Sequence, residues 1–119
     1  MHGIGADIEQ VSRFEKLDLV EHSGFLKRIY TDAELSYCYG KSSPAQYLAA
    51  RFCAKESVVK ALGGLGISGV SYADICIERE GGAPEVTIAK GSPAENCKVA
   101  LSMSHAGGLA LAFAYATAS

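Results

Sequence analysis

The sequence lacks several features that would mark a specialised class of protein. None of its four cysteines belongs to a Cys-x-x-Cys pair, so the chain offers neither a zinc ribbon nor a thioredoxin motif. Its 11 Lys and Arg against 13 Asp and Glu give no basic excess of the kind that nucleic-acid binders carry. No stretch reaches the roughly 18 apolar residues of a membrane span, and the first residues have no basic n-region. We therefore expect a cytoplasmic protein with free thiols that binds neither nucleic acid nor membrane.

Two common phosphate-binding motifs are also absent. Gly3-x-Gly5 starts like a dinucleotide-binding loop, but Ile8 stands where the third glycine belongs, and acidic residues follow. The glycines at 63–69 are not followed by Lys-Ser or Lys-Thr, as a Walker A motif requires. The sequence therefore excludes both the Rossmann and the P-loop interpretation.

What the chain does have is enough apolar material for one domain. Its 119 residues are 49% hydrophobic and 20% charged, and they contain no linker, repeat or low-complexity tract. A chain of this size buries roughly two-thirds of its unfolded surface, so it needs no disulfide or structural metal. We expect a single domain over residues 1–119.

Periodicity predicts helices in the first half and strands in the second. Residues 3–9 alternate as a strand does, with Asp7 and Glu9 on the same face as the glycines. The predicted helix starts are Ser12 with Glu15, Thr31 with Glu34, and Ser43 with Pro44. Later strands are predicted near 75–77, 86–88, 99–103 and 109–115, with a turn at 80–84. This order predicts an α+β domain with a largely antiparallel sheet.

The longest predicted helix covers residues 44–62. At 100° per residue its large apolar side chains fall on one stripe, and its small side chains lie on the far side. The stripe comprises Leu48, Phe52, Val58, Val59 and Leu62, and the small residues are Ala49, Ala50, Cys53, Ala54, Ser57 and Ala61. We expect this helix to be central, buried on two sides and packed on the sheet.

Four charged residues of that helix are candidates for chemistry. Arg51 and Lys55 project into or beside the apolar stripe, while Glu56 and Lys60 are four residues apart on its flank. Glu-Lys pairs at this spacing are commonly surface pairs worth about 0.3–0.5 kcal/mol. A helix packed on two sides leaves little solvated surface for four charges, however, so we expect them to have a partner, a metal or a ligand.

Two further segments add candidates. Considered alone, Asp7 would be a strand-end carboxylate that caps a turn. Together with Glu56 it offers two hard oxygen ligands, which suit Mg²⁺ with water and phosphate oxygens in its remaining coordination positions. Ser104 and His105 lie at a predicted strand end before a glycine turn, where the imidazole could contact a phosphate or take a proton. A histidine that only satisfies local hydrogen bonds is an equal alternative.

Four segments, in this order, resemble the holo-acyl-carrier-protein synthase group of the 4′-phosphopantetheinyl transferases. The similar segments are Gly3 through Arg13, Thr31 to Leu35, the Lys-Glu signature within Arg51 to Lys60, and Ser102 to His105. The chain departs from the family pattern at Cys76, where an acidic residue is usual, at Ala106, and in the glycine-rich stretch 63–69.

The resemblance implies transfer of the phosphopantetheinyl arm of coenzyme A to a serine of an acyl carrier protein, releasing adenosine 3′,5′-bisphosphate. It implies Mg²⁺ as cofactor, with Asp7 and Glu56 as ligands, and a homotrimer with each site between two protomers. Lys60 matches the lysine that stabilises or protonates the leaving phosphate. The resemblance does not decide whether Glu56, His105 or a water molecule is the general base. The expected coenzyme A contacts are Arg51, Lys55, Lys60, Gly63, Ser104 and His105.

Carrier proteins of this kind are typically acidic around the acceptor serine, so a basic patch is expected to dock them. Arg13, Phe25 and Arg28 are the candidates, although intervening acidic residues make an ordinary solvated face an equal alternative. A second class of function is a coenzyme A or nucleotide-binding module of the same fold without catalysis. The joint presence of Asp7, Glu56 and Lys60 favours the enzyme. A structural trimer without a ligand would leave the buried charges unexplained.

Overall fold

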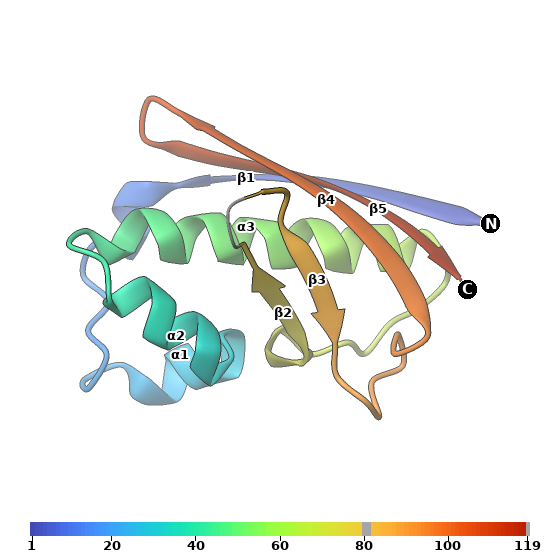
Figure 1. Cartoon of the computed structure of the whole chain (residues 1–119), viewed down its shortest axis with the longest axis horizontal. Coiled ribbons are helices and arrows are strands. Elements are labelled where there is room, and N and C mark those ends of the chain that lie inside the picture. The colour runs from blue at the N-terminus through green and yellow to red at the C-terminus, as the bar shows by residue number, and fades with distance from the viewer. Residues whose placement is uncertain (80–81, 119) are drawn as a thin grey trace.

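A computed structural model describes residues 1–79 and 82–118, and it has a sheet packed on one long helix (Figure 1). Its helices are η1 (Val11–Phe14), α1 (Ser23–Ile29), α2 (Asp32–Tyr39), α3 (Pro44–Gly63) and η2 (Tyr72–Asp74). Its strands are β1 (His2–Gln10), β2 (Ile75–Glu78), β3 (Glu85–Ile88), β4 (Cys97–Ala106) and β5 (Leu109–Ala118). The predicted α+β class is confirmed.

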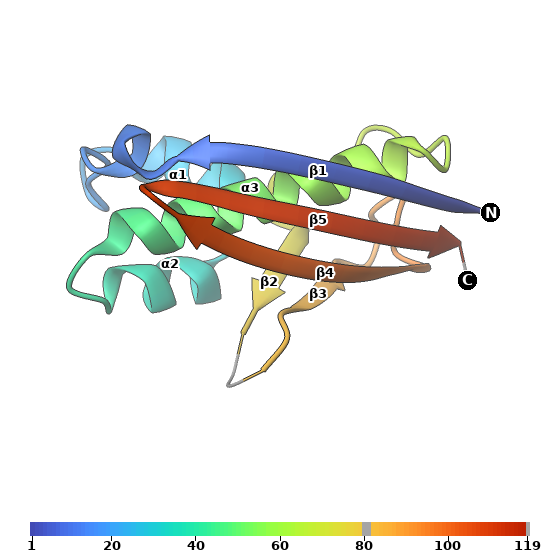
Figure 2. The same cartoon turned by 90° about the horizontal axis from the view of Figure 1, so that it is seen from above.

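The strands form two antiparallel sheets. The larger has the order β1-β5-β4, and β2 pairs only with β3 in a separate hairpin. Figure 2 shows the larger sheet spread over α3, with β1 and β4 at opposite edges. The predicted turn at 80–84 includes residues 80 and 81, which lie outside the described residues. In the described parts of the chain, no helix is long and apolar enough to cross a membrane.

Helix α3 lies against the small-residue face of the larger sheet. The alanines at 110, 112, 114 and 116 on β5 are buried, as are Gly3 and Gly5 on β1. The large side chains on the same strands point the other way: Ile4 is 61% exposed and Phe113 48%. Small inner residues let the helix approach the backbone of the strands closely.

The close approach is very tight at Gly5, as it is at Gly3. A Cβ atom added at Gly5 would lie 2.1 Å from the carbonyl oxygen of Ser57 and 2.7 Å from the amide nitrogen of Ala61. Both are backbone atoms that cannot rotate away, so the strand and helix would have to separate.

We expect Gly5→Ala to lower the free energy of unfolding by about 1–3 kcal/mol, the usual cost of overpacking, measured by urea denaturation. Gly24→Ala is the matched control, because an added Cβ at Gly24 in α1 meets nothing within 4 Å. That variant should be as stable as the parent or slightly more so. Equal effects of the two substitutions would contradict the close packing.

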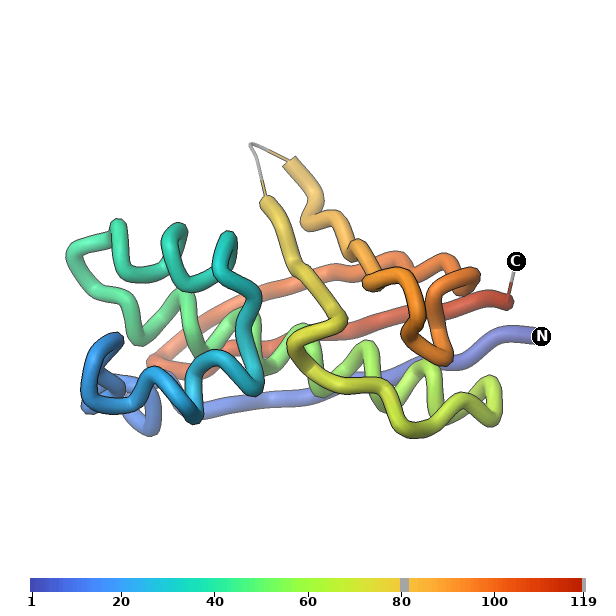
Figure 3. The backbone as a smooth tube through the Cα atoms, turned by 90° about the horizontal axis from the view of Figure 1, so that it is seen from below, coloured from blue at the N-terminus to red at the C-terminus, as the bar shows by residue number. Residues whose placement is uncertain are grey.

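The other side of α3 is covered as well, so the prediction of a central helix buried on two sides is confirmed. Leu48, Val58 and Leu62 have no exposed surface, and neither do the small residues Ala54 and Ala61. Seen from below, α1, α2 and the β2-β3 hairpin lie across the helix (Figure 3). The helix therefore connects the sheet on one side to the small elements on the other.

Of the three predicted helix starts, two agree with the structure and one does not. Thr31 caps α2 with a complete capping box, in which Glu34 bonds back to the Thr31 amide. Pro44 opens α3, although Ser43 makes no side-chain cap bond. The helix predicted from Ser12 is wrong, because the chain there forms only the four-residue 3₁₀ helix η1. Helix α1 was not predicted.

Candidate active site

Asp7 and Lys60 meet at the β1 edge of the sheet. Asp7 lies on the inner face of β1, and its Oδ1 is 3.3 Å from Nζ of Lys60, which also donates to the carbonyl of Ala6 at 3.0 Å. The carbonyl of Asp7 accepts a bond from Sγ of Cys53 at 3.1 Å. The Asp7 carboxylate is mostly buried, whereas Lys60 is about half exposed. The pair therefore joins a strand carboxylate to a solvent-facing cation.

Glu56 lies one helical turn before Lys60 and is held by Tyr72. The Tyr72 hydroxyl donates a hydrogen bond to Oε1 of Glu56. Burial, and then the neighbouring Glu56, raise the pKa of Tyr72 to about 12, so the phenol keeps its proton at neutral pH. Tyr72 was not among the predicted site residues, because nothing in a short segment 16 residues away marks it as a partner of Glu56.

Glu9 is an acidic residue next to Asp7 that was not among the predicted site residues. Burial raises the pKa of Glu9, and the nearby Asp7 raises it further. Arg13 opposes the shift through an ion pair with Glu9 at 2.7 Å. The alternation of β1 already put Glu9 on the face of Asp7, and this was the signal that could have identified it.

The donor set suits a hard cation such as Mg²⁺. Oδ2 of Asp7 is buried and makes no hydrogen bond to any residue that the structure describes. Such an atom is costly to bury, and a bound cation would satisfy it. Within residues 1–79 and 82–118, no three His, Cys, Asp or Glu side chains are grouped to hold a metal. Two carboxylates plus water and phosphate is a common arrangement for Mg²⁺, so Asp7 and Glu56 fit.

A second cluster lines a cavity of about 450 Å³ next to the β4-β5 turn. Arg51, Ser104 and His105 all lie on its wall, together with Tyr37 and Arg79. The guanidinium of Arg51 lies 4.2 Å from the centre of the Tyr37 ring. Arg51 is buried, and its Nε finds no hydrogen-bond partner among the described residues. The cavity is therefore lined by cations suited to an anionic ligand.

The two clusters are separated within one chain. Asp7 is on β1 and His105 on β4, with β5 between them, so the strands that carry them are roughly 10 Å apart. Arg51 and Glu56 are five residues apart on α3, and so project about 140° apart around the helix. The chain thus carries Asp7 on one edge strand of the sheet and His105 on the other.

Comparison with known proteins decides the family. A model described as the 4′-phosphopantetheinyl transferase superfamily matches residues 3–114. The chain belongs to this superfamily. A holo-[acyl-carrier-protein] synthase of Chlamydia muridarum is 40% identical to it, with 98% of this chain and 94% of the relative covered. The resemblance read from the four motifs is confirmed, and the chain is a transferase.

Solved structures of related proteins have the same fold as this transferase. The holo-[acyl-carrier-protein] synthase of Neisseria meningitidis matches with a TM-score of 0.79 and 35% identity, over 97% of both chains. That of Bacillus anthracis, in complex with CoA (3′,5′-ADP), matches with a TM-score of 0.76 and 33% identity, over 98% of this chain and 96% of the other. The transferase therefore shares both fold and length with these enzymes.

Lys55 of the transferase does not have the position expected of a coenzyme A contact. It is fully buried, and its ammonium lies 2.7 Å from Oε1 of Glu34. It also donates to the carbonyls of Tyr72, at 2.9 Å, and Ile75. An ammonium has three donors, and all three are used inside the protein. The predicted ligand contact of Lys55 is corrected to a structural one.

The remaining predicted site residues lie at the surface. Gly63 is the exposed last residue of α3, close to Lys60 in the chain. Arg13 is exposed on η1 and already paired with Glu9. Phe25 is 43% exposed on α1, and Arg28 is an exposed residue of the same helix. The docking candidates therefore come from two short helices that follow β1.

Proposed function

We propose that this transferase moves the 4′-phosphopantetheine arm of coenzyme A to a serine of an apo acyl carrier protein, with Mg²⁺ as cofactor. Relatives that match along most of their length are named holo-[acyl-carrier-protein] synthase, and one of them is described in complex with CoA. The observation that carries the proposal is the contact of Asp7 with Lys60, one helical turn from Glu56, with an oxygen of Asp7 unsatisfied and both carboxylates acting on the Tyr72 phenol.

The carboxylates at the β1 edge would hold the cation. Asp7 offers its unpartnered Oδ2, and Glu56 offers a carboxylate that Tyr72 already orients through Oε1. When bound, Mg²⁺ would neutralise negative charge on the coenzyme A pyrophosphate and so favour its cleavage. The two protein ligands leave the remaining coordination positions to water and phosphate oxygens.

Lys60 would act on the leaving phosphate. In the transfer, the serine oxygen bonds to the phosphorus that carries pantetheine, and the pyrophosphate P–O bond breaks. The serine proton passes to a base, and adenosine 3′,5′-bisphosphate leaves with the added negative charge. The Lys60 ammonium, half exposed beside Asp7, can bond to that phosphate or give it a proton.

The cationic cavity would bind the nucleotide end of coenzyme A. Arg51 and His105 lie on the wall of a space that is large enough for part of a nucleotide, and Ser104 lies there too, although it pairs with Leu111 of the outer face. Because Asp7 and His105 lie on opposite edge strands of the sheet, we propose that a complete site joins the carboxylates of one protomer to the cavity of another.

The outer face of the sheet would form the contact between the protomers of a trimer. Its large apolar side chains, Ile4, Ile8, Leu111, Phe113 and Tyr115, are each more than 40% exposed. A contiguous apolar face of this kind is unusual on a monomer. A second copy covering it would remove these side chains from water and bring the sheet edges of neighbours together.

The acyl carrier protein would dock beside the carboxylates. Arg13 and Arg28 offer positive charge to an acidic partner, and Phe25 offers exposed apolar surface. Arg13 is paired with Glu9, which lies next to Asp7, so the proposed docking surface adjoins the proposed metal site.

A mass measurement tests the function directly. The protein is incubated with coenzyme A, Mg²⁺ and an apo carrier protein, and the carrier should gain the mass of one phosphopantetheine group. Excess chelator should stop the gain, and added Mg²⁺ should restore it. A carrier of unchanged mass, with coenzyme A still bound to the protein, would identify a non-catalytic binding module instead.

We expect Lys60→Ala to lower kcat by about a hundredfold, because one charge-stabilising donor is lost from the transition state. The KM for coenzyme A should change by no more than about threefold. Lys16→Ala, at another exposed lysine, should leave both constants unchanged. A large rise in KM with normal kcat would show that Lys60 contacts only the ground state.

A further inference from the structure

We propose that Tyr72 is a positioning residue of this transferase, which holds the Glu56 carboxylate ready for its cation. The proposal rests on the metal role of Glu56 proposed above. It adds that this role depends on a tyrosine fixed at both ends, whose hydroxyl orients Glu56 and whose backbone is anchored by the neighbouring Lys55.

The hydroxyl end of Tyr72 acts on Glu56 directly. Its hydrogen bond to Oε1 selects one orientation of a long side chain that would otherwise have several rotamers. The phenol ring is itself held, because it packs on the Phe52 ring with the centroids 5.8 Å apart. A carboxylate oriented before the cation arrives loses less conformational freedom on binding.

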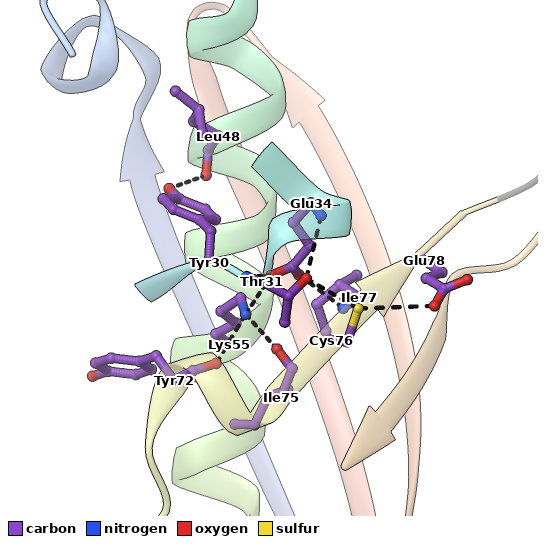
Figure 4. Close-up of polar contacts among 10 residues, drawn as sticks. All are labelled: Tyr30, Thr31, Glu34, Leu48, Lys55, Tyr72, Ile75, Cys76, Ile77 and Glu78. Carbon is purple, nitrogen blue, oxygen red and sulfur yellow. Dashed lines mark hydrogen bonds and ion pairs between the residues drawn. The ribbon is translucent and has the colours of Figure 1, made fainter. Parts of the chain in front are cut away.

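The backbone end of Tyr72 is tied to the helix that carries Glu56. Lys55 donates to the carbonyl of Tyr72, the first residue of η2, at 2.9 Å, and to the carbonyl of Ile75, which follows η2 (Figure 4). The turn η2 has only three residues and no side-chain cap. Lys55 therefore supplies polar bonds that fix where this short turn lies.

Lys55 is in turn fixed by Glu34. Oε1 of Glu34 accepts from Lys55 at 2.7 Å and from the Thr31 amide at 2.8 Å, while Oε2 accepts from the Ile77 amide at 2.8 Å. The carboxylate and the ammonium are almost completely buried. Figure 4 shows the chain of contacts running from Glu34 through Lys55 to the Tyr72 carbonyl.

Adjacent residues of α3 thus contact opposite ends of one tyrosine. Lys55 faces the buried side and holds the Tyr72 carbonyl, and Glu56 faces the site and accepts from its hydroxyl. Through these contacts, the packed interior restricts the orientation of the half-buried Glu56 carboxylate. A tyrosine with a purely structural role would not need a hydroxyl aimed at a residue of the site.

The test measures cation binding rather than activity alone. Mn²⁺ replaces Mg²⁺ and is followed by electron paramagnetic resonance, with coenzyme A present and no carrier protein. We expect Tyr72→Phe to weaken Mn²⁺ binding about tenfold, as loss of an outer hydrogen bond to a metal ligand commonly does. The Mg²⁺ concentration for half-maximal transfer should rise by a similar factor, with the rate at saturating Mg²⁺ nearly restored.

Two further variants separate the possible outcomes. Tyr39→Phe removes a phenol that donates to the Leu17 carbonyl at 3.0 Å, away from the site, and should leave Mn²⁺ affinity unchanged. In a Glu56→Gln background, Tyr72→Phe should add no further loss. The proposal is overturned if Tyr72→Phe binds Mn²⁺ as the parent does while Glu56→Gln binds it weakly. Unchanged affinity in Glu56→Gln itself would overturn the metal role of Glu56 and the proposal together.

Discussion

Replacing Lys55 with methionine is expected to lower the free energy of unfolding by about 3–5 kcal/mol, because it leaves a buried carboxylate without its cation. Lys55 and Glu34 are 0% and 1% exposed, so the remaining carboxylate would have no contact with bulk solvent. Burial lowers the pKa of Lys55, although the attraction of Glu34 opposes that shift. Urea denaturation of the variant gives the measurement.

Two comparisons sharpen this prediction. Lys98→Met, at an exposed position of β4, should change the free energy of unfolding by less than about 0.5 kcal/mol. The double variant Glu34→Gln with Lys55→Met removes both charges and should regain part of the loss. If Lys55→Met folded with full stability and only raised the KM for coenzyme A, Lys55 would be a ligand contact after all.

The sequence predicted the fold where a local pattern and the tertiary structure agree. Residues 44–62 have an apolar stripe, a small-residue face and a proline at the start, and α3 occupies Pro44–Gly63. The capping box at Thr31 needs only two neighbouring side chains, and it forms as predicted. The alternation in β5 predicted two unlike faces, but only packing shows that the alanines lie against the helix.

The sequence misled where tertiary contacts decide a short segment. Ser12 and Glu15 have capping-box spacing, but the Val11 amide bonds to the Gly108 carbonyl at 2.9 Å, and this ties the chain to the β4-β5 turn. Phe14 is buried against Phe52, so the chain turns inward after four residues. Helix α1 has no side-chain cap and depends on burying Leu26 and Ile29.

The site was predictable in its residue types and not in its arrangement. The spacing of Glu56 and Lys60, and Asp7 on a strand, pointed to three groups, of which the fold brings Asp7 and Lys60 into contact with Glu56 one helical turn away. Lys55 is the type of residue that contacts a phosphate group, and only the three-dimensional structure shows that Glu34 neutralises its charge. The separation of His105 from Asp7 depends on strand order, which no local pattern encodes.

That separation has a consequence for assembly. If one protomer supplies Asp7 and its neighbour supplies His105, two inactive variants can repair each other in a mixed oligomer. If one chain encloses the whole site, mixing cannot help. Light scattering on the parent protein should first report a trimer, because the exchange of protomers requires an oligomer.

We expect Asp7→Ala and His105→Ala each to lose nearly all transfer activity alone, and purified trimers that contain both variants to recover about a third of the parent activity, because each has one complete site in three. In random trimers, a site works only when its Asp7 comes from the His105 variant and its His105 from the Asp7 variant. The two proteins are co-expressed with different tags, and trimers that carry both are purified and assayed with apo carrier protein. As the control, Asp7→Ala is mixed with the double variant Asp7→Ala/His105→Ala, which restores no complete site. No recovery in the test mixture would place both residues in a site made by one chain, whereas recovery in the control would show that transfer does not need Asp7.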